Sequence, residues 1–143
     1  MSIRDLRDDE RAWANATYRA IRFLESGPEV RVQLVAEHGD QRIGLGRLVE
    51  LAPGVVELGG IWTAEAMRGR GVARAMVDEL LARSRGPLWC IPFVHLLDFY
   101  TTFGFRPARR PWPAAIAAKV DGIVAASLPA AVVLFLDRPA GVE

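Results

Sequence analysis

The chain has 143 residues, 51% hydrophobic and 24% charged, a composition typical of one soluble globular domain. Its net charge of +1 excludes a global field that would recruit nucleic acid or an anionic membrane. Cys90 is the only cysteine, which excludes an intrachain disulfide and favours a reducing, cytoplasmic compartment. Only two histidines accompany it, so no metal-ligand spacing is present and no metal is expected. The longest apolar run, residues 129–136, is too short to span a bilayer.

The chain begins with a predicted strand and helix. Residues 2–6 form the strand, and Asp8 and Asp9 are predicted to cap the helix. Its apolar positions keep helical spacing as far as Leu24, and Gly27-Pro28 ends it.

A hairpin follows. Residues 30–36 alternate between apolar and polar side chains, as expected for a half-buried strand. Gly39-Asp40 is a turn signal, and residues 43–51 are predicted to return as the second strand. The order Leu-Gly-Arg-Leu at 45–48 breaks the alternation, which predicts a bulge or a change of register there.

The central segment joins a third strand to a long helix. Residues 55–62 are predicted to form the strand, and Gly59 and Gly60 within it mark a bulge or a backbone that is closely approached. Residues 68–73, Arg-Gly-Arg-Gly-Val-Ala, then open an amphipathic helix that Gly86-Pro87 ends.

This Arg/Gly turn has the features of an anion site. Glycines let a ligand approach the backbone, and the first-turn N–H groups of a helix have no intrahelical partner. Those N–H groups and the helix dipole favour phosphate or pyrophosphate, and Arg68, Arg70 and Arg74 add positive charge. The alternative is a plain helix-start loop with solvated arginines.

The last part of the chain alternates strands and helices within what we interpret as one α+β domain. The predicted elements are a strand at 88–93, a helix at 96–102, a turn at 103–105 leading into a strand, a Pro-rich link at 107–113, a helix at 114–127 and a strand at 131–136. Cys90 is expected to be an inert packed thiol on the first of these strands, and His95 a helix-start or surface residue.

Three motifs, in order and at matching separations, resemble the GNAT N-acetyltransferase superfamily. Arg68, Gly71 and Ala73 match its turn Gln/Arg-x-x-Gly-x-Gly/Ala, and residues 99–105 match Phe-Tyr-x-x-x-Gly-Phe. Glu57 stands where many members carry a strand glutamate. The resemblance covers about residues 2–106.

The resemblance implies an α+β fold with a mixed, mostly antiparallel sheet of six to seven strands, flanked by helices and splayed at the cofactor cleft. It implies a single acetyltransferase domain over 1–143, with a cofactor core at about 55–106 and a C-terminal helix and strand at about 113–137. Acetyl-CoA would be the co-substrate, its pyrophosphate on the turn and its pantetheine arm past the strand end. The implied cofactor-binding residues are Ile61, Trp62, Thr63, Arg68, Gly69, Arg70, Gly71, Val72, Ala73 and Arg74.

The family's chemistry gives two residues catalytic roles. Glu57 would be the general base for the acceptor amine, and Tyr100 the general acid for the departing thiolate. A backbone N–H near Trp62 or Thr63 would polarise the thioester carbonyl. The alternatives are that Tyr100 is a core tyrosine and that Glu57 is solvated on the open face of its strand.

The implied activity is acetyl transfer from acetyl-CoA to a primary amine of a small molecule or protein. The alternative is a non-catalytic acyl-CoA-binding or regulatory domain. A nucleotide-binding function is disfavoured because the chain lacks a Gly-Lys-Ser/Thr phosphate loop.

Some features depart from the family pattern. Phe93 stands where many members have a cofactor-contacting Asn, and beyond Pro107 no motif guides the interpretation. The link bearing Trp112 and the helix after it could form the acceptor-specificity element. An edge strand or that helix could also pair with a second copy in a homodimer.

Overall fold

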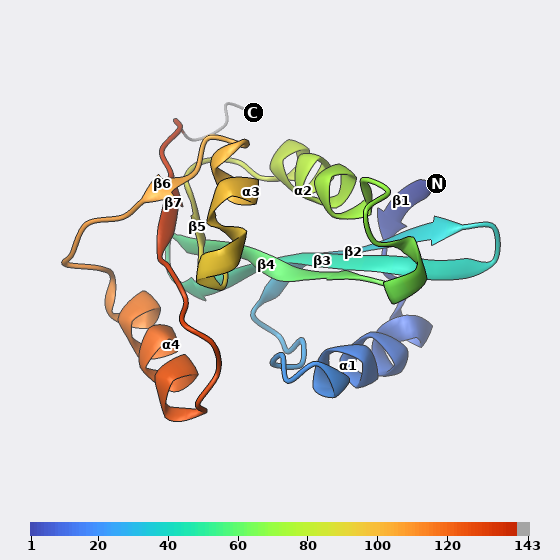
Figure 1. The fold of residues 1–143 in the computed structure, drawn as a ribbon, viewed down its shortest axis with the longest axis horizontal. Helices are drawn as coiled ribbons and strands as arrows, with labels where there is room; N and C mark the ends of the chain where they lie inside the picture. The colour runs from blue at the N-terminus through green and yellow to red at the C-terminus, as the bar shows by residue number, and fades with distance from the viewer. Residues whose placement is uncertain (140–143) are drawn as a thin grey trace. The chain divides into compact units, whose positions relative to one another are not determined.

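The computed structural model describes residues 1–139, which form seven strands and four α-helices (Figure 1). The strands are β1 (Ser2–Asp5), β2 (Val30–His38), β3 (Gln41–Ala52), β4 (Val55–Thr63), β5 (Leu88–Cys90), β6 (Arg106–Pro107) and β7 (Leu134–Leu136). The helices are α1 (Arg11–Ala20), α2 (Val72–Arg83), α3 (Leu97–Thr101) and α4 (Ala114–Ala125). Short 3-10 turns stand ahead of α1, α2 and α3, at Asp8–Glu10, Glu65–Met67 and Val94–Leu96.

Hydrogen bonding orders the strands as β1-β2-β3-β4-β5-β7-β6. β4 and β5 are parallel, whereas β1 with β2, β2 with β3, and β7 with both β5 and β6 are antiparallel. This confirms the predicted α+β class with a mixed, mostly antiparallel sheet. The residues cluster into two compact units. The first unit comprises Met1–Val49 and Gly60–Ser84, and the second comprises Glu50–Gly59 and the chain from Arg85 onward.

In the first unit, α1 and α2 cover opposite faces of β2 and β3 (Figure 1). Leu45 points toward α1, where it joins a buried cluster with Ala14, Tyr18 and Val35. Gly46, the next residue of β3, points toward α2, where a Cβ would lie 2.6 Å from Met76 Cγ. The lack of a side chain at Gly46 therefore lets the helix pack closely on the strand.

The predicted bulge at 45–48 is wrong. Residues 44–47 pair in unbroken register with residues 33–36, and the shifts lie on either side, between Val30 and Val32 and between Ala36 and Glu37. The polarity pattern misleads here because β3 is buried on both faces, so its side chains do not alternate between core and solvent.

The first helix is shorter than predicted. α1 ends at Ala20, because Arg22 takes a left-handed φ of 63° and the Phe23 N–H turns back to the Tyr18 carbonyl at 2.9 Å. Leu24 is 72% exposed and is no part of the apolar face. Asp8 and Asp9 are not the caps either: a Glu10 carboxylate oxygen accepts the Arg7 backbone N–H at 3.0 Å.

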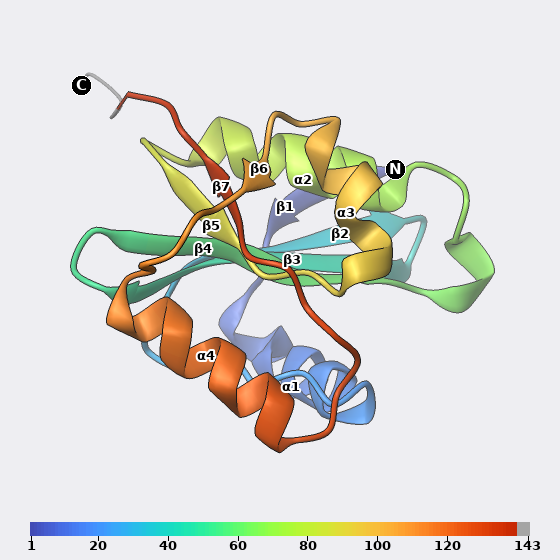
Figure 2. The same ribbon diagram turned by 60° about the vertical axis from the view of Figure 1, so that its left-hand side comes forward.

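The second unit packs its strands on a small apolar core. Leu88, Phe105 and Leu134 are fully buried, and Ile116 anchors α4, which lies in the connection between β6 and β7 (Figure 2). β5 is shorter than the predicted 88–93. It ends at Cys90, because Pro92 has no N–H to give to a ladder.

Candidate functional site

The Arg/Gly turn forms the predicted helix entrance in the first unit. Gly69 and Gly71 both have left-handed φ, 76° and 82°, which side chains rarely adopt. Gly71 is the N-cap of α2 with no side-chain hydrogen bond, and its carbonyl accepts the Ala75 N–H at 3.0 Å. The backbone N–H groups ahead of Ala75 therefore precede the intrahelical ladder.

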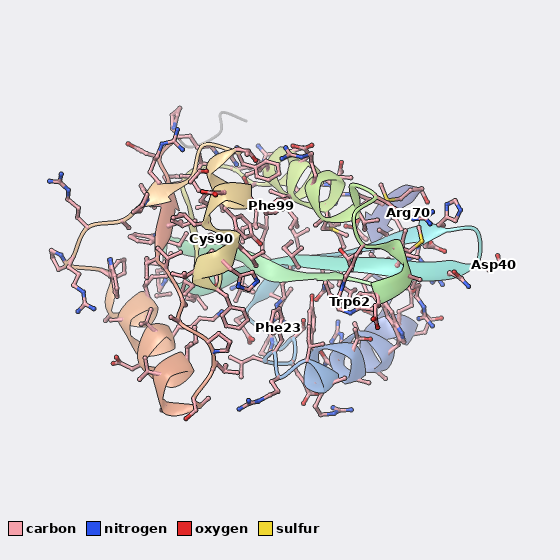
Figure 3. All side chains as sticks on the ribbon, viewed as in Figure 1. Phe23, Asp40, Trp62, Arg70, Cys90 and Phe99 are labelled. Carbon is pink, nitrogen blue, oxygen red and sulfur yellow. The ribbon has the colours of Figure 1, made fainter. Side chains whose placement is uncertain are left out.

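The charged side chains of this turn are exposed. Arg68, Arg70 and Arg74 are all exposed, and Figure 3 labels Arg70 on the turn. An anion on the turn would thus meet positive charge from two sources, the helix dipole and the guanidinium groups.

Side chains of the first unit closely approach the backbone of the glycine-broken strand that precedes the turn. Gly60 has φ 61°, its carbonyl accepts the Tyr18 hydroxyl at 2.8 Å, and a Cβ there would lie 2.7 Å from Arg47 Nε. Arg47 is itself buried and donates to Ser26 Oγ and to the Leu24 carbonyl, each at 2.8 Å. This network holds the backbone conformation that leads into Ile61, Trp62 and Thr63.

Among residues 61–63, Trp62 has the side chain with the best-defined contacts. Its ring meets Trp13 edge to face at 5.8 Å, and the Ala64 N–H donates to the Ile43 carbonyl at 2.8 Å just beyond it. The three predicted pantetheine positions, residues 61–63, are half-buried.

Glu57 is buried and ion-paired within the second unit. Its side chain is 6% exposed, and its carboxylate accepts a hydrogen bond from Lys119 Nζ, on α4. The alternative of a solvated glutamate on an open strand face is therefore wrong. Gly59 lies two residues further along the strand, and it has no side chain that could contact the carboxylate.

Tyr100 lies in the core of the second unit. It is 4% exposed, its ring meets Phe105 edge to face at 6.1 Å, and its hydroxyl is hydrogen-bonded to the Cys90 thiol. Burial, and then the negative charges that Cys90 and Glu57 can carry, raises the pKa of the Tyr100 hydroxyl well above 10. The phenol therefore holds its proton at neutral pH, as a general acid must.

Cys90 is buried, as expected, and Figure 3 labels it on β5. Burial raises the pKa of its thiol well above 9, so the sulfur is a poor nucleophile. His95 is exposed on the turn before α3 and stacks on Phe93, with ring centroids 6.3 Å apart.

Strand register separates the two catalytic candidates. Glu57 is the β4 partner of Trp89, so it shares a sheet face with that residue. Cys90, the next residue of β5, points to the other face, and Tyr100 contacts it there. The charge of Glu57 still contributes to the raised pKa of Tyr100, so the two groups lie within electrostatic range of each other.

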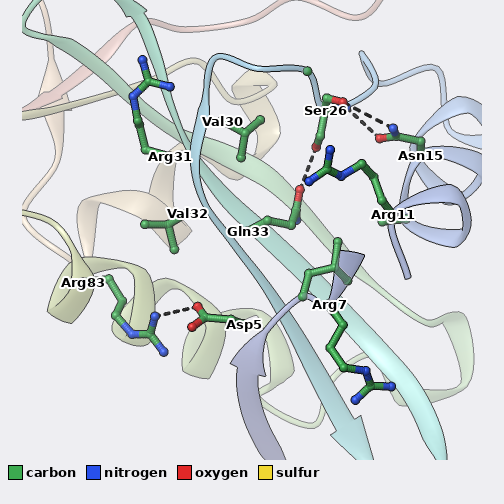
Figure 4. Close-up of a pocket in the computed structure, with 13 residues that line it drawn as sticks. Asp5, Arg7, Arg11, Asn15, Ser26, Val30, Arg31, Val32, Gln33 and Arg83 are labelled. Atoms are coloured by element: carbon green, nitrogen blue, oxygen red, sulfur yellow. Dashed lines mark hydrogen bonds and ion pairs between the residues drawn. The ribbon is translucent and has the colours of Figure 1, made fainter. Parts of the chain in front are cut away.

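Two cavities among the described residues lie away from both catalytic candidates. One of about 430 Å³ in the first unit lies beside β1, α1 and β2, and Arg83 pairs with Asp5 at 2.7 Å on its wall (Figure 4). A second of about 370 Å³, in the second unit, is lined by Trp89, Phe135 and the segment around Arg106. Neither is lined by Glu57 or Tyr100. Within residues 1–139 no His, Cys, Asp and Glu side chains group in threes around a metal-sized space, and no helix is long and apolar enough to cross a membrane.

Sequence reasoning missed Lys119. It is the only lysine of the chain, but it stands 62 residues from Glu57 on a helix that matches no motif. Its uniqueness among 18 basic residues was the one available signal.

Comparisons with known proteins identify the family of the chain and its fold. The model of the acetyltransferase (GNAT) family matches residues 1–105, and no curated protein matches the chain. Among solved structures, Rv2747 from Mycobacterium tuberculosis, in complex with CoA, is 18% identical with a TM-score of 0.70, covering 96% of this chain and 99% of its own. The ribosomal-protein-S18-alanine N-acetyltransferase from Escherichia coli is 15% identical, with a TM-score of 0.65 and coverage of 99% and 96%.

A third structure, N-acetylglutamate synthase from Neisseria gonorrhoeae with coenzyme A and N-acetyl-glutamate, is 14% identical with a TM-score of 0.73. It matches 96% of this chain, which spans only 35% of that one. At these identities the structures establish the fold, and the family model establishes the membership. The chain belongs to the GNAT acetyltransferase family.

Proposed function

We propose that this protein is an N-acetyltransferase that moves the acetyl group of acetyl-CoA to a primary amine of a small molecule or protein. The observation that carries the proposal is the setting of Glu57. The glutamate at the family's strand position is buried, and its carboxylate already holds an amino group, that of Lys119. A carboxylate that binds an ammonium can also take its proton.

We assign the binding of the acetyl donor to the Arg/Gly turn. The pyrophosphate of acetyl-CoA would bind the backbone N–H groups of Gly69 to Ala73, with Arg68, Arg70 and Arg74 around it. The pantetheine arm would pair with the backbone of residues 61–63. CoA complexes among the structural neighbours, those of Rv2747 and N-acetylglutamate synthase, support this assignment.

We assign the two proton transfers to residues of the second unit. Glu57 takes a proton from the acceptor ammonium, directly or through a water, and the amine attacks the thioester carbonyl. Tyr100 gives its proton to the thiolate as the carbon–sulfur bond breaks. The raised pKa of Tyr100 keeps the phenol protonated at neutral pH, so the proton is present when the thiolate forms.

A panel of small amines and peptides, each mixed with acetyl-CoA, tests the proposal through the CoA thiol released. Cys90 is the only thiol of the chain and is 2% exposed, so the protein itself adds little background. Glu57→Gln should lower amine-dependent release by about 100-fold, the scale of general-base catalysis. The control Glu79→Gln removes a more exposed carboxylate that pairs with Arg83, and should change nothing. Tight acetyl-CoA binding without release for any amine would instead indicate the non-catalytic binding domain.

A further inference from the structure

The second unit contains a cavity that the proposed function does not use. Its volume is about 370 Å³, within the range of sites that bind small molecules. It is lined by Trp89 of β5, Phe135 of β7, residues 106–109 and Asp137, all of which belong to this unit. The cavity is therefore defined by contacts within one compact unit.

Trp89 and Phe135 form an aromatic wall of this cavity. They are register partners on the neighbouring antiparallel strands β5 and β7, so their side chains lie on one face of the sheet. Their ring centroids are 4.6 Å apart, and the ring planes are tilted by 48°. Both residues are only half-buried, so part of each ring is left for a ligand. A planar aromatic ring would pack offset or edge to face against such a pair.

Arg106 supplies a positive charge at the same cavity. It is the register partner of Phe135 on β6. Its Nη1 donates to the Phe105 carbonyl at 2.8 Å and to the Thr101 carbonyl at 3.2 Å, and these two bonds orient the guanidinium. Within residues 1–139, no group accepts a hydrogen bond from its Nε or Nη2, and no carboxylate pairs with it.

The remaining edge of that guanidinium indicates the class of ligand. Nε and Nη2 present two parallel N–H groups, which match the two oxygens of a carboxylate. Two other charged residues line the cavity, Arg109 and Asp137, so arginines outnumber carboxylates there by two to one. An anion is therefore favoured over a neutral or cationic ligand.

We propose that this cavity binds a small planar aromatic carboxylate. The ring of the ligand packs against Trp89 and Phe135, and its carboxylate accepts hydrogen bonds from Nε and Nη2 of Arg106. This site is independent of the proposed function, because it uses neither the Arg/Gly turn nor Glu57 and Tyr100.

The test titrates the purified full chain with 2-naphthoate by calorimetry. The wild type should bind one molecule, with a Kd of about 1 mM or tighter for a ligand of this size. Two matched probes each lack one of the two features. The neutral 2-naphthamide should bind about 10-fold more weakly, because it loses the charged hydrogen bonds. The saturated decahydro-2-naphthoate should bind about 3-fold more weakly, because it has no aromatic ring.

Three variants locate the site. Arg106→Gln should weaken 2-naphthoate binding about 10-fold and leave 2-naphthamide binding unchanged. Asp137→Asn should strengthen 2-naphthoate binding about 2-fold, because it removes a negative charge from the lining. The control Arg110→Gln removes a neighbouring exposed arginine that stacks on Trp112 and does not line the cavity, so it should bind 2-naphthoate like the wild type.

Several results would overturn the inference. They are the absence of any binding heat at millimolar 2-naphthoate, equal affinity of the wild type for 2-naphthoate and 2-naphthamide, and unchanged 2-naphthoate binding in Arg106→Gln. Weaker binding in Asp137→Asn would also overturn it, since a carboxylate should gain from that change. The proposed function would stand in each case, because acetyl-CoA and the acceptor amine are assigned to other residues.

Discussion

Replacing Gly60 with alanine should destabilise the protein strongly, whereas the same change at its neighbour Gly59 should not. Alanine at φ 61° is strained by roughly 1–2 kcal/mol. Its Cβ would lie 2.7 Å from Arg47 Nε and 2.8 Å from the Tyr18 hydroxyl, closer than real side chains come. One or both partners must move, which costs about 1–3 kcal/mol more in buried hydrogen bonds. The total is about 3 kcal/mol.

Gly59 is a matched control. A Cβ there would meet only the Glu57 carboxylate, at an ordinary contact distance of 3.7 Å, and its φ is not left-handed. We expect Gly59→Ala to change the free energy of unfolding by less than about 1 kcal/mol. Urea unfolding followed by tryptophan fluorescence measures both variants, and the melting temperature of Gly60→Ala should fall by roughly 10 °C. Equal losses in the two variants, or no loss at Gly60, would refute the role given to its backbone.

The other predictions concern the proposed donor turn, the proposed general acid and an ion pair of the first unit. Arg68→Ala with Arg70→Ala should weaken acetyl-CoA binding about 10-fold or more by calorimetry, because the proposed pyrophosphate site would lose two charged contacts; an Arg109→Ala control should bind normally. Tyr100→Phe should lower turnover about 100-fold and leave acetyl-CoA affinity intact, and unchanged turnover would remove Tyr100 as the acid. Arg4, which donates to the Glu10 carboxylate at 2.7 and 3.0 Å, lowers the pKa of Glu10 from 4.5 to about 2. The resulting stability, about 3 kcal/mol, is present above pH 4.5 and is lost as the pH falls toward 2, so denaturant titrations of Glu10→Gln should lack this loss.

The order of elements could be predicted from the sequence because the elements depend on local chemistry. Glycine pairs, prolines and apolar spacing placed α2, α3 and α4 within a few residues of their positions. The end of α1 could not be predicted in this way. It depends on the left-handed backbone of Arg22, and this position carries neither the glycine nor the asparagine that usually marks such a helix end.

The same distinction between local signals and long-range contacts applies to the candidate site. The Arg/Gly turn and Tyr100 could be predicted as candidates from motifs because each is defined by a short run of residues. The partner of Glu57 could not, since it lies 62 residues away and the contact depends on how α4 packs. The polarity pattern of β3 failed for a related reason: a strand covered by helices on both faces does not alternate.

The most direct test of the central claim uses acetyl-CoA labelled at its acetyl carbonyl carbon and follows that carbon during reaction with an amine. We predict that the labelled carbon becomes the carbonyl carbon of an amide, with one CoA thiol released for each amide formed. Glu57→Gln should slow both events together. A bound thioester that keeps its label, or a label that appears only as acetate, would contradict it.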